Sequence, residues 1–263
     1  MITSTQNNKV KLVRALMGKR KDRQSQGAFV VEGVRLVEEA LACGWLPQFV
    51  LFTDQVSDRG QEVAQGFAAQ GVEVEQVAPH VMESMTGTKS PQGILAVLPF
   101  RQVAIQDDLD FVLVVDQVRD PGNLGTILRT AAAAGVQTVI LTPGTTDAFA
   151  PKVVRSGMGA HFRLPVIEMT WQQLHAAHQY GELNKIHFYL ADAGGESDCW
   201  ALDWTQPVGL IIGGEAAGAG TEAHKLAAGL VSIPMPGQME SLNAAIAGSV
   251  LMFEVVRQRD NNS

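Results

Sequence analysis

The sequence predicts an α/β fold with two domains, the second of which is built on a mostly parallel sheet. Short apolar runs alternate with segments of helical periodicity along the whole chain, which is typical of α/β proteins. A polar stretch at residues 101–109, RQVAIQDDL, separates two groups of such elements. Beyond it, runs such as DFVLVVD at 110–116 are almost continuously apolar, which indicates strands buried on both faces. The 263 residues suffice for two domains of common size.

The first domain is predicted to span residues 1–100. Gly44 and Gly71 are expected to end two of its helices, and the alternating run VEVEQV is expected to form an edge strand. The expected strands are 28–33, 47–53, 72–77 and 93–100, and the expected helices are 34–44, 58–71 and 80–87.

The second domain is predicted to span residues 110–263. Its strands alternate with helices, so we expect most of them to run parallel, with ligands binding at their carboxyl ends. The expected strands are 110–116, 138–142, 186–191, 208–213 and 229–234. The expected helices are 123–134, 151–157, 171–180 and a long C-terminal helix from about Ser241.

The composition argues against several classes of protein. It is 46% hydrophobic and 18% charged, as in ordinary globular proteins, and contains no apolar run of membrane-spanning length. The basic N-terminus lacks the apolar region of a secretory signal, so we expect a cytoplasmic protein. Cys43 and Cys199 are far apart with no CxxC, and the histidines show no metal-ligand spacing. We therefore expect neither a disulfide framework nor a metal site.

Charge is distributed unevenly along the chain. The net charge is −7, but residues 1–26 carry seven basic residues against Asp22 alone, so this segment is +6 and the remainder is −13. A basic arm on an acidic body would confine contacts with nucleic-acid phosphates to one place. The alternative is a solvated amphipathic helix with no ligand. The candidate residues for such contacts are Lys9, Lys11, Arg14, Lys19, Arg20, Lys21 and Arg23.

The first of three unusual loops follows the strand at 110–116 and reads DQVRDPGNLGTILRTAAAAG. Its prolines and glycines shape a turn, and Asn123 is a plausible cap for the helix that follows. Arg129 lies less than two helical turns further on, in an otherwise apolar segment where an arginine usually needs a partner. The alternative to a functional pair is a structural cap with a salt-bridged arginine.

The second and third loops follow the strands at 208–213 and 229–234. In LIIGGEAAGAG, Glu215 is the single charge among glycines and alanines, and the loop lacks both GxxxxGK[ST] and GxGxxG. Glycines directly after a buried strand allow close approach to the backbone, although a flexible turn is the alternative. In SIPMPGQMESLNAAIAGS, Ser241 is expected to cap the C-terminal helix, and Asn243 offers a donor and an acceptor.

These three loops resemble, in order and spacing, the three motifs of the SpoU (TrmH-type) RNA 2′-O-ribose methyltransferases of the SPOUT superfamily. The matching stretches are PGNLGTILRTAAAAG, IIGGEAAG and IPMPGQMESLNAAIAGS. FAPKVVRSGMGAHFRLP at 149–165 is similar to the segment between the first two motifs. The N-terminal part looks like the L30e-like substrate-binding domain of the ribosomal-RNA members.

The resemblance implies a fold, a cofactor and partners. The C-terminal domain would contain a deep trefoil knot that binds S-adenosylmethionine, and two chains would dimerise through their C-terminal helices. The reaction would be methylation of a ribose 2′-hydroxyl in RNA. The substrate-binding domain favours ribosomal RNA, with transfer RNA as the alternative. The small residues after Ser241 would then belong to the cofactor cleft and the dimer contact.

The resemblance also implies roles for individual residues. Arg129 would be the central catalytic residue, and because an arginine essentially never loses its proton, we interpret it as orienting the ribose and phosphate rather than acting as base. The residues implied to position it and the nucleotide are Asn123, Glu215, Ser241 and Asn243. The residues implied to bind the cofactor are Thr142, Gly144, Gly213, Gly214, Ile233, Met235, Leu242, Asn243 and Ala247.

Two other classes of function stay open on the residues alone. A strand leading into a glycine-containing turn fits a dinucleotide-dependent oxidoreductase, but GxGxxG is absent. An RNA-binding or assembly protein with a dead site would use the basic segment alone, but the motif residues Arg129, Glu215 and Asn243 are all present.

Overall fold

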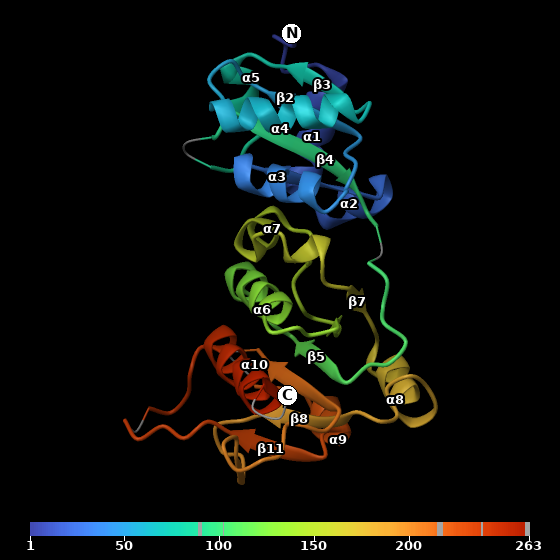
Figure 1. Ribbon diagram of the computed structural model, residues 1–263, viewed down its shortest axis with the longest axis vertical. Coiled ribbons are helices and arrows are strands. Elements are labelled where there is room, and N and C mark those ends of the chain that lie inside the picture. Colours follow the sequence, from blue (N-terminus) through green and yellow to red (C-terminus); the bar gives the residue numbers. More distant parts are fainter. Residues whose placement is uncertain (89–90, 102, 215–217, 238, 261–263) are drawn as a thin grey trace. The chain divides into compact units, whose positions relative to one another are not determined.

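The structure is a computed structural model that describes residues 1–88, 91–101, 103–214, 218–237 and 239–260 (Figure 1). Its contacts divide the chain into two compact units. Unit 1 comprises Met1–Arg101 and Phe149–Phe162, and unit 2 comprises Gln102–Ala148 and Arg163–Ser263. The sequence places the segment 149–162 in the second domain, whereas its contacts group it with unit 1.

Unit 1 is built on a four-stranded mixed sheet in the order β1-β4-β2-β3. Strand β4 pairs antiparallel with both β1 and β2, and β2 pairs parallel with β3, which is the edge strand that the alternating sequence predicts. The strands are β1 Ala28–Glu32, β2 Phe49–Phe52, β3 Glu73–Gln76 and β4 Ile94–Pro99. The helices are α1 Asn8–Gly18, α2 Arg20–Gln26, α3 Val34–Ala42, α4 Asp58–Ala69, α5 Pro79–Glu83 and α7 Pro151–Gly157, followed by the 3₁₀ turn η1 Ala160–Phe162.

The basic N-terminal segment is part of the packed domain rather than a separate arm. Helix α1 starts after Asn7, whose side chain accepts a hydrogen bond from the Lys9 amide. Val10, Val13 and Leu16 follow at helical spacing and are fully buried in the core of unit 1. Helix α1 is therefore amphipathic and packed into unit 1, and RNA binding by its exposed basic residues stays a prediction.

Aromatic contacts explain why residues 149–162 group with unit 1. The Phe149 ring lies 4.9 Å from that of Phe29 and 4.6 Å from that of Phe100, centroid to centroid. Phe162 packs at 5.3 Å against Trp45, whose indole donates a hydrogen bond to the Phe162 carbonyl. Aromatic packing of this kind adds to the stability gained from apolar burial.

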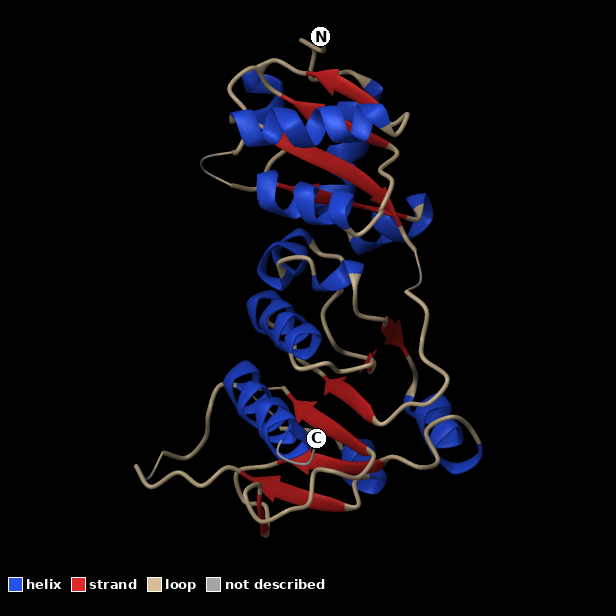
Figure 2. Cartoon of the chain, viewed as in Figure 1, coloured by secondary structure: helices blue, strands red, loops and turns tan. Residues whose placement is uncertain are grey.

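Unit 2 is built on a seven-stranded sheet in the order β7-β6-β5-β10-β8-β11-β9, with every recorded pairing parallel (Figure 2). The strands are β5 Phe111–Asp116, β6 Thr138–Leu141, β7 Val166–Glu168, β8 His187–Ala191, β9 Ser197–Asp198, β10 Val208–Gly213 and β11 Gly229–Ser232. The helices are α6 Pro121–Ala133, α8 Trp171–Tyr180, α9 Thr221–Leu226 and α10 Ala244–Asp260. The predicted parallel α/β sheet is confirmed, and the trefoil knot stays a prediction.

Helices cover both faces of this sheet, as the continuous apolar strands require. On one face, Val112 and Val114 of β5 share a core with Leu174 of α8. On the other face, Gly248 of α10 lies against Ile212 of β10, and α10 packs beside α6 (Figure 1). A glycine at this point lets the helix backbone approach the sheet closely. No helix in the described ranges is long and apolar enough to cross a membrane.

Two predicted helix caps are wrong. Helix α6 begins at Pro121, and its cap is Asp120, whose carboxylate accepts a 2.9 Å hydrogen bond from the Asn123 amide. Helix α10 begins at Ala244, three residues after Ser241. Its first amides are held by Asn243, whose Oδ1 accepts from the amides of Ala245 and Ile246 at 2.9 and 3.2 Å. Asp followed by Pro at the first helical position is the sequence signal that identifies the α6 cap.

Candidate active site

A cavity of about 480 Å³ opens at the carboxyl ends of the central strands of unit 2. It is lined by residues directly after β8, β10 and β11, as expected for an open parallel sheet. The start of α10 forms another wall. Seven of the predicted cofactor-binding residues lie in its lining: Gly213, Gly214, Ile233, Met235, Leu242, Asn243 and Ala247.

The lining of this cavity is mostly backbone and apolar side chain. Val231, Ile233 and Leu251 supply apolar surface, and Ala247 keeps the α10 wall smooth. Asp192, directly after β8, is the one charged residue among the described residues of the lining. The sequence analysis missed Asp192, although an acid at the carboxyl end of a predicted strand was the available signal.

Asn243 joins the cavity to helix α6. Its Nδ2 donates a 3.1 Å hydrogen bond to Oδ1 of Asn123, which is 120 residues earlier in the chain. At the same time its Oδ1 caps α10, so both ends of this amide are engaged. Because Asp120 rather than Asn123 caps α6, the Asn123 side chain is available for this contact. The structure thus brings together two of the predicted catalytic residues.

Arg129 is exposed on α6, less than two turns after Asn123. The expectation that it sits among apolar side chains is wrong, because its neighbours Ile127 and Leu128 are buried while its own side chain points to solvent. The expected protein partner stays a prediction, since the acidic candidate Glu215 lies outside the described residues. Among the described residues, no hydrogen bond or ion pair holds its guanidinium, and it does not line the cavity. An exposed arginine close to the Asn123–Asn243 pair is available to a ligand.

Two further predicted catalytic residues have different outcomes. Ser241 is exposed and lines the cavity, although it is not the helix cap. Glu215 lies outside the residues that the structure describes.

Thr142 and Gly144 do not line the cavity but contact the end of β5. The Thr142 hydroxyl donates a 2.5 Å hydrogen bond to Oδ1 of Asp116, which is fully buried. Oδ2 of Asp116 accepts a 2.8 Å hydrogen bond from the Gly220 amide. Gly144 has φ +94°, and a Cβ there would lie 3.1 Å from the Gln117 side chain. Asp116, which the sequence analysis did not single out, therefore ties the loops after β6 and β10 to β5.

The glycines after β10 are required by neighbouring backbone. A Cβ on Gly213 would lie 2.6 Å from the Ala219 amide nitrogen, and one on Gly214 would lie 2.4 Å from the Gln117 carbonyl oxygen. Real Cβ atoms do not come this close to backbone, so any other residue would displace the loop that lines the cavity. The glycines thus shape the site through loop packing, in addition to leaving room for a ligand.

The cavity fits S-adenosylmethionine in size and chemistry. Its volume is within the range of about 300–1,000 Å³ that small-molecule sites occupy. Apolar side chains suit the adenine ring, exposed backbone suits the polar edge of the base, and the carboxylate of Asp192 suits a cation. No group of histidine, cysteine or acidic residues within the described ranges is arranged to hold a metal ion.

The predicted RNA-binding residues of unit 1 fall into two groups. Lys9 is half-buried and forms ion pairs of 2.7 Å with Glu73 and 2.6 Å with Glu75 on β3. Burial alone would lower the pKa of Lys9, but the hydrogen bonds with Glu73 and Glu75 outweigh it and raise that pKa. Arg23 is 3% exposed, and its guanidinium donates to the carbonyls of Leu16 and Gly18 at 2.7 and 3.2 Å.

The remaining basic residues of the segment are on the surface. Arg14 donates a 3.1 Å hydrogen bond to the Ser84 carbonyl and stays exposed. The other exposed members are Lys11, Lys19, Arg20 and Lys21. Lys9 and Arg23 therefore serve the fold, and only the exposed group is accessible to RNA.

A parallel α/β domain with a cavity at the carboxyl ends of its strands that suits a nucleoside-containing cofactor is typical of a class of nucleotide-cofactor enzymes. Comparison with known proteins identifies the family. Residues 110–253 match the SpoU rRNA Methylase family, and residues 7–96 match the MRM3-like substrate binding domain. The chain belongs to the SpoU rRNA methylase family.

Its relatives match over almost the whole chain. It is 35% identical to an uncharacterized tRNA/rRNA methyltransferase of Synechocystis, covering 98% of this chain and 94% of the relative. It is 32% identical to the 23S rRNA (guanosine(2553)-2′-O)-methyltransferase of Bacillus subtilis, covering 97% and 98%. The crystal structure of an AdoMet-bound rRNA methyltransferase from Sinorhizobium meliloti superposes with a TM-score of 0.85 at 32% identity, covering 97% of each chain.

Proposed function

We propose that this protein transfers a methyl group from S-adenosylmethionine to a ribose 2′-hydroxyl of ribosomal RNA. The observation that carries the proposal is the cavity at the strand ends, where residues of the second and third motifs meet and Asn243 bonds to Asn123 of the first. Two relatives that match over nearly their full length are 23S rRNA 2′-O-methyltransferases, which supports ribosomal over transfer RNA as substrate.

Different residues of the unit 2 cavity would contact different parts of the cofactor. Gly213 and Gly214 would present backbone to the cofactor, while Ile233 and Leu242 would cover its apolar parts. Met235, Asn243 and Ala247 would complete the lining; contacts from Thr142 and Gly144 stay a prediction. When bound, S-adenosylmethionine supplies an electrophilic methyl group on a sulfonium.

Arg129 would hold the RNA rather than the cofactor. Its guanidinium is exposed, and its planar donors match a phosphate or ribose oxygen pair. A guanidinium does not act as a base near neutral pH, so its contribution would be to align the 2′-oxygen and stabilise developing negative charge. Asn123 would fix the position of α6 relative to the cavity, Ser241 at the cavity rim would face the nucleotide, and Glu215 would be a further positioning residue.

We also propose a homodimer formed through the C-terminal domain. Helix α10 exposes Ile246 (51%) and Phe253 (49%), seven residues apart and therefore on one face. Changing both to Asp should give a monomer in sedimentation at micromolar concentration. Trp200→Asp, which alters a similarly exposed apolar residue elsewhere in unit 2, should leave the dimer intact. A monomeric wild-type chain would overturn this part of the proposal.

The proposal includes two further expectations from the sequence. A trefoil knot is supported by the match of residues 110–253 to the SpoU rRNA Methylase family. A cytoplasmic location is supported by the similarity to a bacterial 23S rRNA methyltransferase, since bacterial ribosomes are assembled in the cytoplasm.

Calorimetric titration with S-adenosylmethionine and with NAD tests the function against its rivals. The proposal predicts saturable binding of S-adenosylmethionine and none of NAD, together with transfer of labelled methyl to protein-free 23S rRNA. Binding of NAD alone would favour an oxidoreductase. RNA binding without cofactor binding would favour an assembly protein with a dead site.

A further inference from the structure

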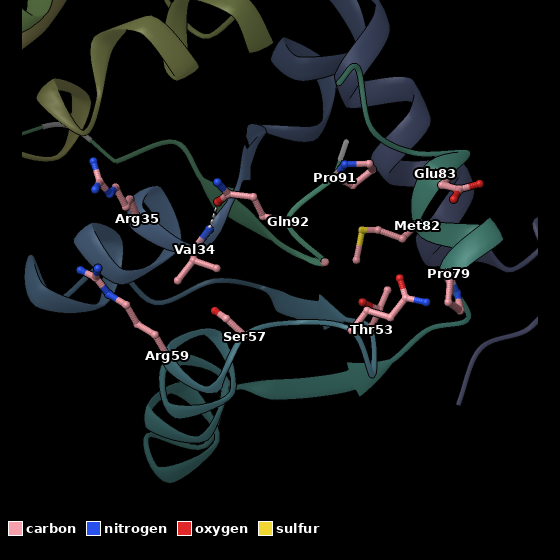
Figure 3. A pocket seen from close by; sticks show the side chains of 12 residues that line it. Val34, Arg35, Thr53, Ser57, Arg59, Pro79, Met82, Glu83, Pro91 and Gln92 are labelled. Carbon is pink, nitrogen blue, oxygen red and sulfur yellow. Dashed lines mark hydrogen bonds between the residues drawn. The ribbon is translucent and has the colours of Figure 1, made fainter. Parts of the chain in front are cut away.

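A second cavity, of about 450 Å³, lies within unit 1, and none of the residues assigned to catalysis lines it (Figure 3). The N-termini of α3 and α4 reach it with Val34 and Ser57, and the turn after β2 and the segment leading into β4 supply other walls. Partial positive charge at two helix N-termini favours an anionic ligand.

Thr53 lines this cavity with a hydroxyl that faces the open space. The residue as a whole is 3% exposed, and within the described part of the chain its hydroxyl forms no hydrogen bond. An unpaired hydroxyl on an otherwise buried side chain is free to bond to a ligand or water that enters the cavity. Gly93, with φ +74°, makes room for it, since a Cβ there would lie 2.5 Å from the Thr53 hydroxyl oxygen.

The charges around the cavity are separated. Arg35 and Arg59 lie at one side in Figure 3, and Glu83 lies at the other. Arg59 is held by Glu38 in a two-point contact that leaves Arg59 exposed. Arg35 is exposed, and no described residue forms a hydrogen bond or ion pair with it. The arginine side is therefore where a phosphate would bind.

Apolar side chains line the space between these polar groups. Val34 and Met82 are buried residues whose side chains face the cavity, and Pro79 and Pro91 add further apolar surface. A flat base would cover such surface, because every base has an apolar face and a polar edge. The combination of apolar walls, one unpaired hydroxyl and a cationic rim matches a nucleotide.

We propose that this cavity binds one unpaired nucleotide of the RNA substrate, with its phosphate at Arg35 and its base or ribose edge at the Thr53 hydroxyl. This rests on the proposed function, and it assigns a residue-level site within the substrate-binding domain at 7–96. Double-stranded RNA keeps its bases stacked, so only a single-stranded or extruded nucleotide would enter.

The test measures affinity of the full chain for protein-free bacterial 23S rRNA and for single-stranded RNA hexanucleotides. Thr53→Val removes the hydroxyl at nearly constant volume and should weaken binding about five-fold, the effect of one hydrogen bond. Thr53→Ser keeps the hydroxyl and should restore affinity. Arg35→Gln should weaken binding about ten-fold through loss of a charge-assisted contact. Lys185→Gln, an equal charge change at an exposed site of unit 2, should have no effect.

Three results would bear on the proposal. Unchanged RNA affinity in both Thr53→Val and Arg35→Gln overturns it. Equal binding of a hexanucleotide and of its annealed duplex also overturns it. If a free 5′-mononucleotide binds as tightly as the hexanucleotide and loses affinity in Thr53→Val, the cavity serves a free nucleotide instead.

The same experiment separates this inference from the proposed function. S-adenosylmethionine affinity and the unfolding midpoint of each variant should match wild type, which shows that both units are folded. If the wild-type protein transfers methyl groups but the variants bind RNA with unaltered affinity, the unit 1 cavity is not an RNA site, whereas the proposed methyltransferase function stands. If RNA binding depends on Thr53 but no methyl group is transferred, the unit 1 cavity is an RNA site and the proposed methyltransferase function is wrong.

Discussion

The two cavities are nearly equal in size but differ in what lines them. The unit 2 cavity, about 480 Å³, presents glycine backbone, small side chains and a single charge at Asp192. The unit 1 cavity, about 450 Å³, presents two arginines, a glutamate and several polar side chains. Backbone fixed by packing suits one small ligand of constant shape, whereas long charged side chains suit a flexible polyanion. The difference favours the cofactor in the unit 2 cavity and, under the proposal above, RNA in the unit 1 cavity.

The two units also differ in how the glycines of unit 2 and the basic residues of unit 1 are held. In unit 2, glycines 213 and 214 are fixed by contact with backbone from other loops. In unit 1, basic residues of one short segment divide between the core, as with Arg23, and the surface, as with Lys11. Position in a parallel sheet therefore predicts a site better than the presence of charge does.

The largest expected effect comes from a substitution that disrupts the unit 2 cavity. Gly213→Val should abolish saturable binding of S-adenosylmethionine in calorimetry, because its side chain would collide with the backbone of residues 218 and 219. Gly237→Val is the matched control, since a Cβ at Gly237 would meet no atom within 4 Å. Normal cofactor affinity in Gly213→Val would contradict the geometry of this loop.

Arg129→Ala should separate RNA alignment from cofactor binding. Turnover in single-turnover methylation should fall on the order of a hundredfold, the scale of losing one aligned catalytic group. S-adenosylmethionine affinity should stay as in wild type, because Arg129 does not line the cavity. Arg129→Lys should not rescue turnover, since a point charge lacks the planar fork. Near-normal turnover in either variant would remove Arg129 from the mechanism.

Arg23→Ala should destabilise unit 1 without a specific effect on RNA. Its guanidinium is buried against two backbone carbonyls, so the free energy of unfolding should fall by about 2 kcal/mol. Lys21→Ala, which truncates an exposed residue of the same helix, should change it by less than about 0.5 kcal/mol. Denaturant unfolding measures both, and equal effects would contradict a structural role for Arg23.

The smallest expected effect compares Lys11 with Lys9 in RNA binding. Lys11 is exposed, so Lys11→Gln should flatten the dependence of log affinity on log salt by about 0.7–0.9 if that lysine touches one phosphate. Lys9 is already neutralised by Glu73 and Glu75, so Lys9→Gln should leave the slope unchanged. The slopes are obtained from RNA affinities measured at several salt concentrations. A larger change of slope for Lys9→Gln than for Lys11→Gln would show that RNA displaces the ion pairs of Lys9 with Glu73 and Glu75.

Much of the fold follows from sequence pattern because hydrophobic periodicity fixes each element locally. The strand at 208–213 and the helices at 151–157 and 171–180 have the predicted bounds. The short strands β7 and β9 were not predicted, since three and two residues carry no periodicity. The grouping of 149–162 with unit 1 depends on aromatic contacts between distant segments, which no local pattern reveals.

The site was predictable to the extent that loop position decides it. Asn123 and Asn243 meet because the segments that follow β5 and β11 both start at the carboxyl edge of one parallel sheet. The exposure of Arg129 could not be predicted, because it depends on which face of α6 packs inward. The pairing of Lys9 with Glu73 and Glu75 depends on which strand lies beside α1. The unit 1 cavity went unnoticed because Thr53 and Arg35 belong to no motif.

The most direct test of the account locates the transferred methyl group. The protein is incubated with methyl-labelled S-adenosylmethionine and protein-free 23S rRNA, and the RNA is then hydrolysed with alkali. Alkaline cleavage uses the free 2′-hydroxyl, so a methylated ribose protects the adjoining phosphodiester. The account predicts label in one alkali-resistant dinucleotide and its loss in Arg129→Ala. Label on the base of a mononucleotide, or unlabelled RNA from protein saturated with cofactor, would contradict the account.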